Sequence, residues 1–148
     1  MFKPERDDAR RYFCETWKKA RAGLPLDGME SMIATIIQAH PEYQPWLENT
    51  EKSLMEEWLP ENGETNPFLH LSMHLAIEEQ LAINQPKGIR SYYEKLATQL
   101  GDEHRAQHEI LDCLAEMLWQ SQRNQAPPDA EIYLACLEKK LGKLQNYR

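Results

Sequence analysis

Apolar residues recur at intervals of three and four along most of this chain, and that spacing constrains its fold more than any other feature. The run Met29, Met32, Ile33, Ile36 and Ile37 is a clear example. Such spacing places side chains on one face of an α-helix, whereas a half-buried strand alternates with a period of two. Sustained alternation of β-branched residues is nearly absent. We therefore expect an all-α protein, a bundle of about six to seven helices.

Capping residues, prolines and glycines mark the expected helix ends. Asp27 precedes Glu30 by three residues, as in a capping box. Asn66 is a suitable N-cap, and a proline in the first helical position follows it. Asp102 is placed to cap the next long helix. The expected helices cover about 4–23, 28–40, 67–83, 89–100 and 103–124 and a stretch after 129, with one or two short helices within 41–59 and a turn at 60–65.

Length and charge narrow the class of protein. The 148 residues fit one domain, 1–148, and 17 basic against 24 acidic residues give a net charge of -7. We expect no nucleic-acid partner, because binding to phosphates needs massed lysine and arginine. The sequence shows neither a signal peptide nor an apolar run long enough for a membrane span, so we expect a cytoplasmic protein without a membrane partner.

The three cysteines, Cys14, Cys113 and Cys136, lie far apart and show no C-x-x-C spacing. This spacing suggests neither a disulfide framework nor a thiolate zinc knuckle. We expect each cysteine to be a small buried hydrophobic residue.

Four of the five histidines form two pairs with a spacing of four, His70 with His74 and His104 with His108. Residues four apart share a helix face, where two imidazole nitrogens can bind one ion at about 2.0–2.1 Å. Each pair shares its face with aliphatic residues, so we expect both pairs to point inward. The sequence therefore predicts a divalent metal site between two central helices, with the four histidines as ligands.

Carboxylates near these pairs are expected to support the site. Glu79 and Asp112 are the preferred ligands or supporting groups; Glu79 is chosen because it lies in a strongly apolar helix, where a polar residue is hard to expose. Glu78 and Glu116 are further candidates. Imidazoles and carboxylates without thiolates suit zinc, iron, manganese or nickel, with zinc or iron leading. The fifth histidine, His40, stands at a helix end and is expected to cap it rather than bind the ion.

Three segments carry a resemblance to a known family. They are Asn66–Ile77, His104–His108 and Cys113–Trp119, and through them most of the chain resembles a bacterial domain family of unknown function. The resemblance implies a bacterial cytosolic protein and assigns no catalytic residue. The ligand pattern is also loosely similar to that of hemerythrin-like helical metalloproteins, an analogy of architecture alone.

Two classes of function follow from these observations. The first is a helical metalloprotein: a metal-dependent hydrolase or oxidoreductase, or an O2- or metal-responsive binding protein. In an enzyme, Glu79 or Asp112 would be the general base. The alternative is a structural or interaction module whose core histidines hold no metal and whose partner is another protein or a second copy of the chain, giving a homo-oligomer. The six glycines form no phosphate-binding or dinucleotide-binding motif, and no nucleophile elbow is present.

Overall fold

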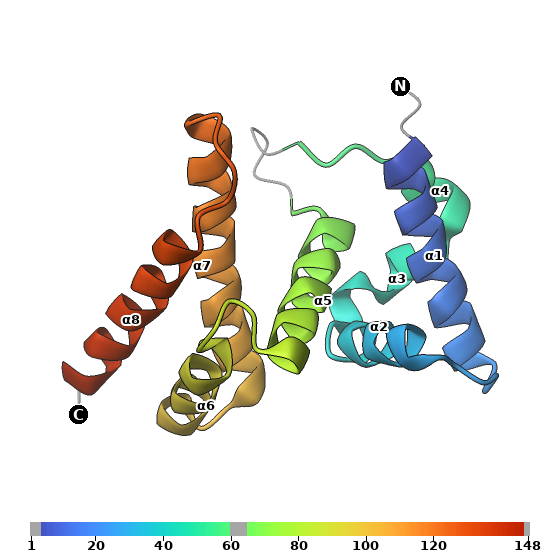
Figure 1. Ribbon diagram of the computed structural model, residues 1–148. Coiled ribbons are helices and arrows are strands. Elements are labelled where there is room, and N and C mark those ends of the chain that lie inside the picture. The colour runs from blue at the N-terminus through green and yellow to red at the C-terminus, as the bar shows by residue number, and fades with distance from the viewer. Residues whose placement is uncertain (1–3, 60–64, 147–148) are drawn as a thin grey trace. The chain divides into compact units, whose positions relative to one another are not determined.

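The structure is a computed structural model that describes residues 4–59 and 65–146 (Figure 1). Within these two ranges the chain forms eight α-helices and one short 3-10 helix, and it forms no strand. The all-α prediction is confirmed. Of the turn predicted at 60–65, all but the last residue lies outside the described residues. No described helix is both long and apolar enough to cross a lipid bilayer.

The chain divides into two compact units, an N-terminal unit (Met1–Leu75) and a C-terminal unit (Ala76–Arg148). The boundary falls inside α5 (Pro67–Ile83), so each unit contains about half of this helix. The prediction of one domain over 1–148 stays a prediction, because two compact units can still unfold as one domain.

The N-terminal unit contains the first four helices and the 3-10 helix in addition to the start of α5. These elements are α1 (Pro4–Arg21), α2 (Gly28–Gln38), η1 (Pro41–Tyr43), α3 (Gln44–Leu47) and α4 (Thr50–Met55). The predicted capping box at the start of α2 is confirmed. The side chain of Asp27 accepts a hydrogen bond from the backbone N–H of Glu30 at 2.7 Å, and the Glu30 carboxylate accepts one from the Asp27 N–H at 3.0 Å.

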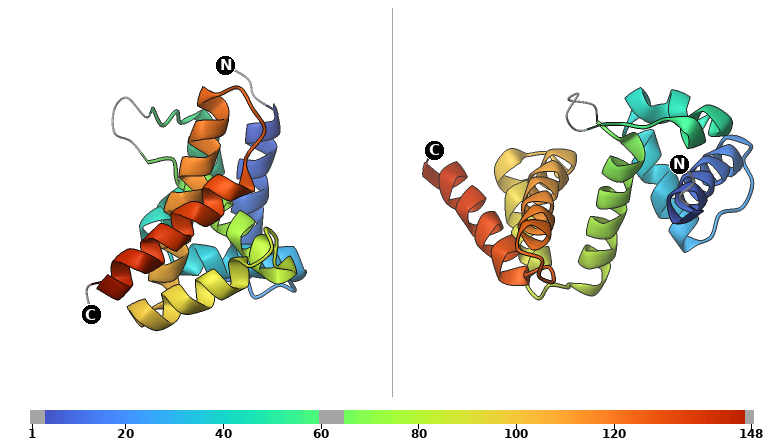
Figure 2. Two further views of the ribbon diagram at one scale, coloured as in Figure 1. Left: turned by 60° about the vertical axis from the view of Figure 1, so that its left-hand side comes forward. Right: turned by 90° about the horizontal axis from the view of Figure 1, so that it is seen from above.

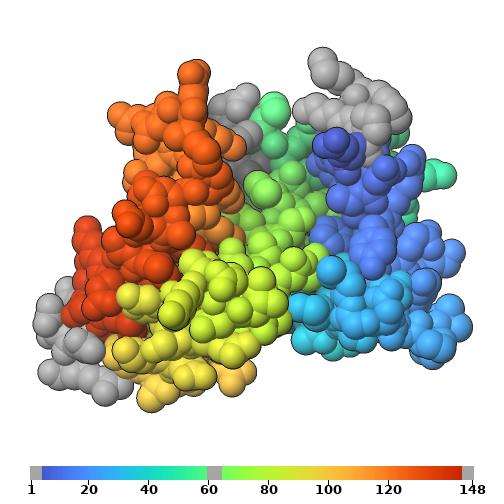
Figure 3. Space-filling view, viewed as in Figure 1, coloured from blue at the N-terminus to red at the C-terminus, as the bar shows by residue number. Residues whose placement is uncertain are grey.

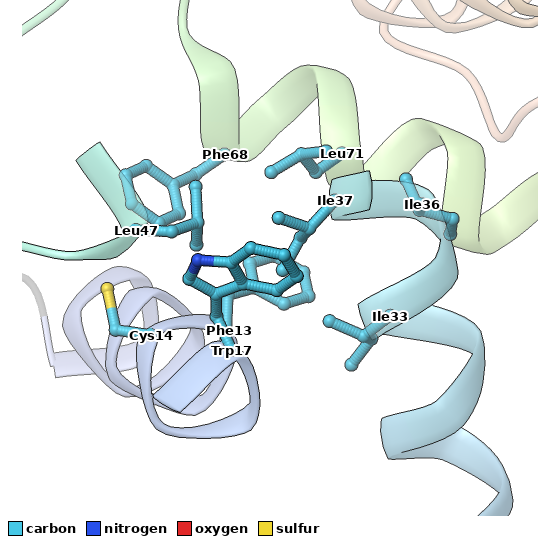
Figure 4. Packing of buried hydrophobic residues seen from close by; sticks show 9 residues of the cluster. All are labelled: Phe13, Cys14, Trp17, Ile33, Ile36, Ile37, Leu47, Phe68 and Leu71. Atoms are coloured by element: carbon cyan, nitrogen blue, oxygen red, sulfur yellow. The ribbon is translucent and has the colours of Figure 1, made fainter. Parts of the chain in front are cut away.

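The core of the N-terminal unit is built from four helices (Figure 4). Its buried members are Phe13, Cys14, Trp17, Ile33, Ile36, Ile37, Leu47, Phe68 and Leu71. All of these side chains are apolar, and where one helix contributes several of them they recur at helical spacing. Full burial of a large side chain of this kind contributes about 1.5–3 kcal/mol. This core holds the end of α2 and the start of α5 in the same unit, which positions the residues described below.

The C-terminal unit contains the rest of α5 with α6 (Ile89–Leu100), α7 (Glu103–Arg123) and α8 (Ala130–Asn146) (Figure 2). Helices α6, α7 and α8 pack against one another in all three pairings. Gly101 ends α6 in the left-handed conformation with φ 68°, so this helix covers the predicted range 89–100. The side chain of Asp102 then accepts hydrogen bonds from the first turn of α7, which confirms the predicted cap.

A disulfide joins Cys113 of α7 to Cys136 of α8, with 5.6 Å between their Cα atoms. The prediction of no disulfide is therefore wrong for these two residues. Sequence spacing reveals cysteines paired within a compact motif, whereas this pair depends on how α8 lies on α7. Cys14 is buried and is not part of a disulfide, as expected.

Candidate metal centre

The first half of α5 positions His70 and His74. The Asn66 side chain accepts hydrogen bonds from the N–H groups of Phe68 at 3.0 Å and Leu69 at 3.2 Å, so the helix begins where the sequence predicted. Phe68 belongs to the core and fixes the rotation of the helix. The two histidines then lie one turn apart on one face, with 3.2 Å between their Nε2 atoms.

His40 joins this pair from the end of α2. Its Nδ1 donates a hydrogen bond to the carbonyl oxygen of Ile36 at 2.8 Å, and its backbone N–H donates to the carbonyl of Ile37 at 3.0 Å. These contacts confirm the predicted capping role, and they do not test the expectation that His40 caps the helix rather than binding the ion. A carbonyl oxygen can only accept, so the ring proton is on Nδ1 and Nε2 carries the lone pair that a metal needs. Apart from the residue type, no feature of the sequence signals this approach, because His40 and His70 are 30 positions apart.

The three rings form a compact cluster within the N-terminal unit. The centroid of the His40 ring lies 5.1 Å from that of His70 and 4.7 Å from that of His74. One nitrogen from each ring lies within 4.8 Å of the others. Two nitrogens bound tetrahedrally to one ion at about 2.05 Å are about 3.3 Å apart. The separation between His70 and His74 already has this value, and the His40 nitrogen needs to move inward by at most about 1.5 Å.

The cluster is largely shielded from water. His40 and His74 are only 2% and 1% exposed, and His70 is half-buried. Tyr43 stacks on the His40 ring at 5.5 Å with an interplanar angle of 7° and meets His70 edge to face at 5.6 Å. Burial, with the nearby charge of Glu42, raises the pKa of the Tyr43 hydroxyl. Tyr43 therefore remains neutral at physiological pH and forms a wall beside the imidazoles.

The second predicted pair lies in the C-terminal unit, and each unit is described by itself. The rings of His104 and His108 are neighbours, with centroids 4.3 Å apart. His104 is exposed and His108 is half-buried, so the prediction that both point inward is wrong for His104. His104 lies in the first turn of α7, where its backbone N–H donates a hydrogen bond to the capping side chain of Asp102 at 2.9 Å. A first turn at a capped helix end has fewer neighbours to cover it than the middle of the helix has.

The predicted carboxylates also lie in the C-terminal unit. Glu79 is exposed, so its expected burial is wrong: two residues correspond to about 200° of rotation, which points it away from the fully buried Ile77. Asp112 is exposed, and one of its oxygens lies 3.4 Å from Nζ of Lys140. Glu78 accepts a hydrogen bond from the amide of Gln107 on α7. The ligand roles of Glu79 and Asp112 stay predictions.

Over residues 4–59 and 65–146, eight helices and a shielded cluster of three histidines define the class: an all-α protein with histidine side chains grouped at the spacing of metal ligands. The chain belongs to the family described as a domain of unknown function, DUF1841, whose model matches residues 5–139. The predicted resemblance to an uncharacterised family is therefore confirmed. No curated protein and no solved structure matches the chain. The function has to be argued from the residues themselves.

Proposed function

We propose that this protein binds a divalent transition-metal ion through His40, His70 and His74, with zinc or iron as the preferred ion. The observation that carries the proposal is the 3.2 Å separation of the Nε2 atoms of His70 and His74, with the His40 ring 4.7 Å from that of His74. The hydrogen bond from His40 to the Ile36 carbonyl supports it, because metal-binding histidines commonly donate their other ring N–H to such an acceptor.

Three neutral imidazoles suit a catalytic type of site better than a closed structural one. Structural zinc sites use four protein ligands, whereas three leave a position for water or a substrate. Bound there, the ion supplies Lewis acidity and an activated water. A metal-dependent hydrolase, an oxidoreductase or a metal-responsive binding protein all fit this ligand set. The sequence-based prediction that His104, His108, Glu79 and Asp112 also serve as ligands stays a prediction.

The competing interpretation is a structural one, in which the histidines only bind each other and the backbone. The 3.2 Å contact between the Nε2 atoms would then be a single N–H···N hydrogen bond, which needs one donor and one acceptor. Metal binding requires that both Nε2 atoms lack a proton. The two interpretations therefore differ in the tautomer of one ring and in metal content.

The deciding experiment measures metal in untagged protein purified without a metal-affinity column. We expect about one zinc or iron ion per chain in the wild type and less than about 0.2 in His74→Gln, whose polar side chain can maintain the fold. Replacement by cobalt should give the visible spectrum of a four- or five-coordinate site in the wild type only. A metal content below about 0.2 ions per chain in the wild type, with no uptake when metal is added, would refute the proposal.

His104→Gln is the matched control, because His104 belongs to an equally spaced pair and is itself exposed. If the three-histidine cluster holds the ion alone, this variant retains the metal. If His104→Gln and His108→Gln both lose it, the wider ligand set predicted from the sequence is correct. If the metal is lost only when His104 and His108 are both replaced, the ion was captured adventitiously by that pair.

A further inference from the structure

The packing of α7 and α8 leaves a pocket of about 740 Å³ in the C-terminal unit, and no function considered so far uses it. The two helices adjoin at the surface in the space-filling view (Figure 3). One wall of the pocket carries the acidic residues Glu109, Asp112 and Glu116 at intervals of three and four on α7. The volume lies in the range of about 300–1,000 Å³ that is typical of small-molecule sites.

The facing wall is basic and belongs to α8. Lys139, Lys140 and Lys143 line it, with Lys143 four and three residues beyond the other two, and Ile132 and Leu144 add apolar surface beside them. Residues three and four apart share a helix face, so Lys143 lies near both of the other lysines, and the three carboxylates of α7 lie along one face. The pocket thus has an acidic side, a basic side and an apolar portion.

A disulfide and the ionic contacts of one lysine hold the two walls together. The disulfide between Cys113 and Cys136 joins the two helices, and Cys136 itself lines the pocket. The ammonium group of Lys140 binds the carboxylate of Glu109 and lies 3.4 Å from Asp112. With the walls tied in this way, the pocket exists before a ligand arrives, which lowers the entropic cost of binding.

The distribution of charge selects the kind of ligand. Three carboxylates and three ammonium groups give the lining no net charge, so an ion of one sign gains little overall. A molecule with a cation at one end and an anion at the other can satisfy both walls. Lys139 and Lys143 are exposed and can reach the anionic end, while the exposed Glu116 can reach the cationic end.

We propose that the pocket between α7 and α8 binds a small zwitterion with an apolar body, in particular a short apolar peptide with free ends. Its carboxylate contacts the lysines of α8, its ammonium group contacts the carboxylates of α7, and its side chains lie against Ile132 and Leu144. The pocket is larger than a single amino acid needs, and this favours a peptide of a few residues.

The test is a titration of the full-length, oxidised, 15N-labelled protein with the tripeptide Leu-Leu-Leu, followed by NMR. We expect shifts for residues that line the pocket. Either N-acetylation or C-terminal amidation of the peptide should weaken binding about two- to five-fold, which corresponds to one exposed ion pair. Titration with 6-aminohexanoic acid, which has both charged ends and no peptide group, separates a requirement for peptide from a requirement for charge alone.

Two variants assign the contact to a wall. Lys143→Gln should weaken binding of the free tripeptide about two- to five-fold and should not weaken binding of the amidated one further. Lys95→Gln, which changes an exposed lysine of α6 outside the pocket, is the control and should leave the affinity unchanged. Three results would overturn the proposal. The first is the absence of shifts for pocket residues at about 10 mM peptide, which is on the order of the weakest useful affinity. The second is equal binding of blocked and free peptides, and the third is a set of shifts that depend on protein concentration without peptide, which would mean that a second copy covers this face.

Discussion

At the end of α2, the His40 ring is held in place without any ion, because its Nδ1 donates to the Ile36 carbonyl at 2.8 Å and Tyr43 stacks on its face. An imidazole oriented in this way loses little freedom when its Nε2 binds a metal. The same hydrogen bond also satisfies one of the last carbonyls of α2. His40 therefore links the stability of a helix end to the geometry of the candidate centre.

Replacing His40 by alanine should separate these two roles. We expect zinc affinity to fall by at least about 100-fold, because losing one of three ligands should cost more than the roughly 10–100-fold that follows loss of a group that only supports a ligand. The metal-free protein should lose at least about 1 kcal/mol of stability, because the variant loses one hydrogen bond at the helix end and the packing of a buried ring. Competition titration with a chromophoric chelator measures the first effect, and urea denaturation in EDTA measures the second. Unchanged zinc affinity would remove His40 from the site.

Glu30 should make the stability of the N-terminal unit depend on pH. The hydrogen bond from Lys19 at 2.8 Å, and then the one from the Asp27 backbone, lower the pKa of the Glu30 carboxyl in the folded state. Folding therefore favours the ionised carboxylate of Glu30. The stability that this carboxylate adds to the fold is present above the ordinary glutamate pKa of about 4.3, and it is lost as the pH falls through the lowered pKa of the folded state.

Thermal denaturation of the wild type and Glu30→Gln tests this dependence. At pH 7 the variant should melt at a lower temperature, and the difference should shrink as the pH approaches 3. Glu15→Gln, an exposed carboxylate on α1, is the control and should show a small difference at every pH. A gap between wild type and Glu30→Gln that stays constant from pH 7 to 3 would contradict the assignment.

Individual residues show how far the sequence could lead to the candidate site. The spacing of His70 and His74 predicts their shared face, since both lie on one helix. The approach of His40 depends on the chain reversal through η1, α3 and α4, which no local pattern describes. Glu79 was misplaced because α5 is apolar on nearly every side, so the sequence does not reveal which of its few polar residues faces outward.

At the scale of elements, caps and periodicity define the helices, whereas contacts between helices set the rest. The starts of α2, α5 and α7 follow from Asp27, Asn66 and Asp102, whose side chains accept hydrogen bonds from N–H groups of the first turn. The disulfide between α7 and α8 depends on the register of two separate helices. Local sequence holds no signal for that register, and the cysteine prediction failed there for this reason.

The disulfide should contribute strongly to the stability of α8 on α7. It links cysteines 23 positions apart, and closing a loop of that length stabilises a fold by about 3 kcal/mol in the chain-entropy model. We expect the double variant Cys113→Ala, Cys136→Ala to lose stability of that order in urea. Reductant should destabilise the wild type and leave the double variant unaffected. Cys14→Ala, which lacks the buried thiol but keeps the disulfide, should still respond to reductant; if it does not, the disulfide is not the group being reduced.

For the whole molecule, α5 is the element that both units need. Its first half contributes Phe68 and Leu71 to the core of the N-terminal unit. In its second half, Gln80 accepts a hydrogen bond at 2.7 Å from the hydroxyl of Tyr133 on α8. Unfolding of either unit exposes half of this helix, and a helix of 17 residues has little stability in water without tertiary packing.

We therefore expect the units to unfold together, in one calorimetric transition, as a single domain over 1–148 would. Zinc should raise the temperature of that one transition, since an ion that binds only the folded state adds about 2.7 kcal/mol at a free concentration of 100 times Kd. A break in α5 at Ala76→Pro, placed at the boundary between the units, should split the transition in two and restrict the zinc effect to one of them. Two transitions in the wild type, with zinc shifting only one, would show that the units are separate domains and that the histidine cluster belongs to the one that shifts.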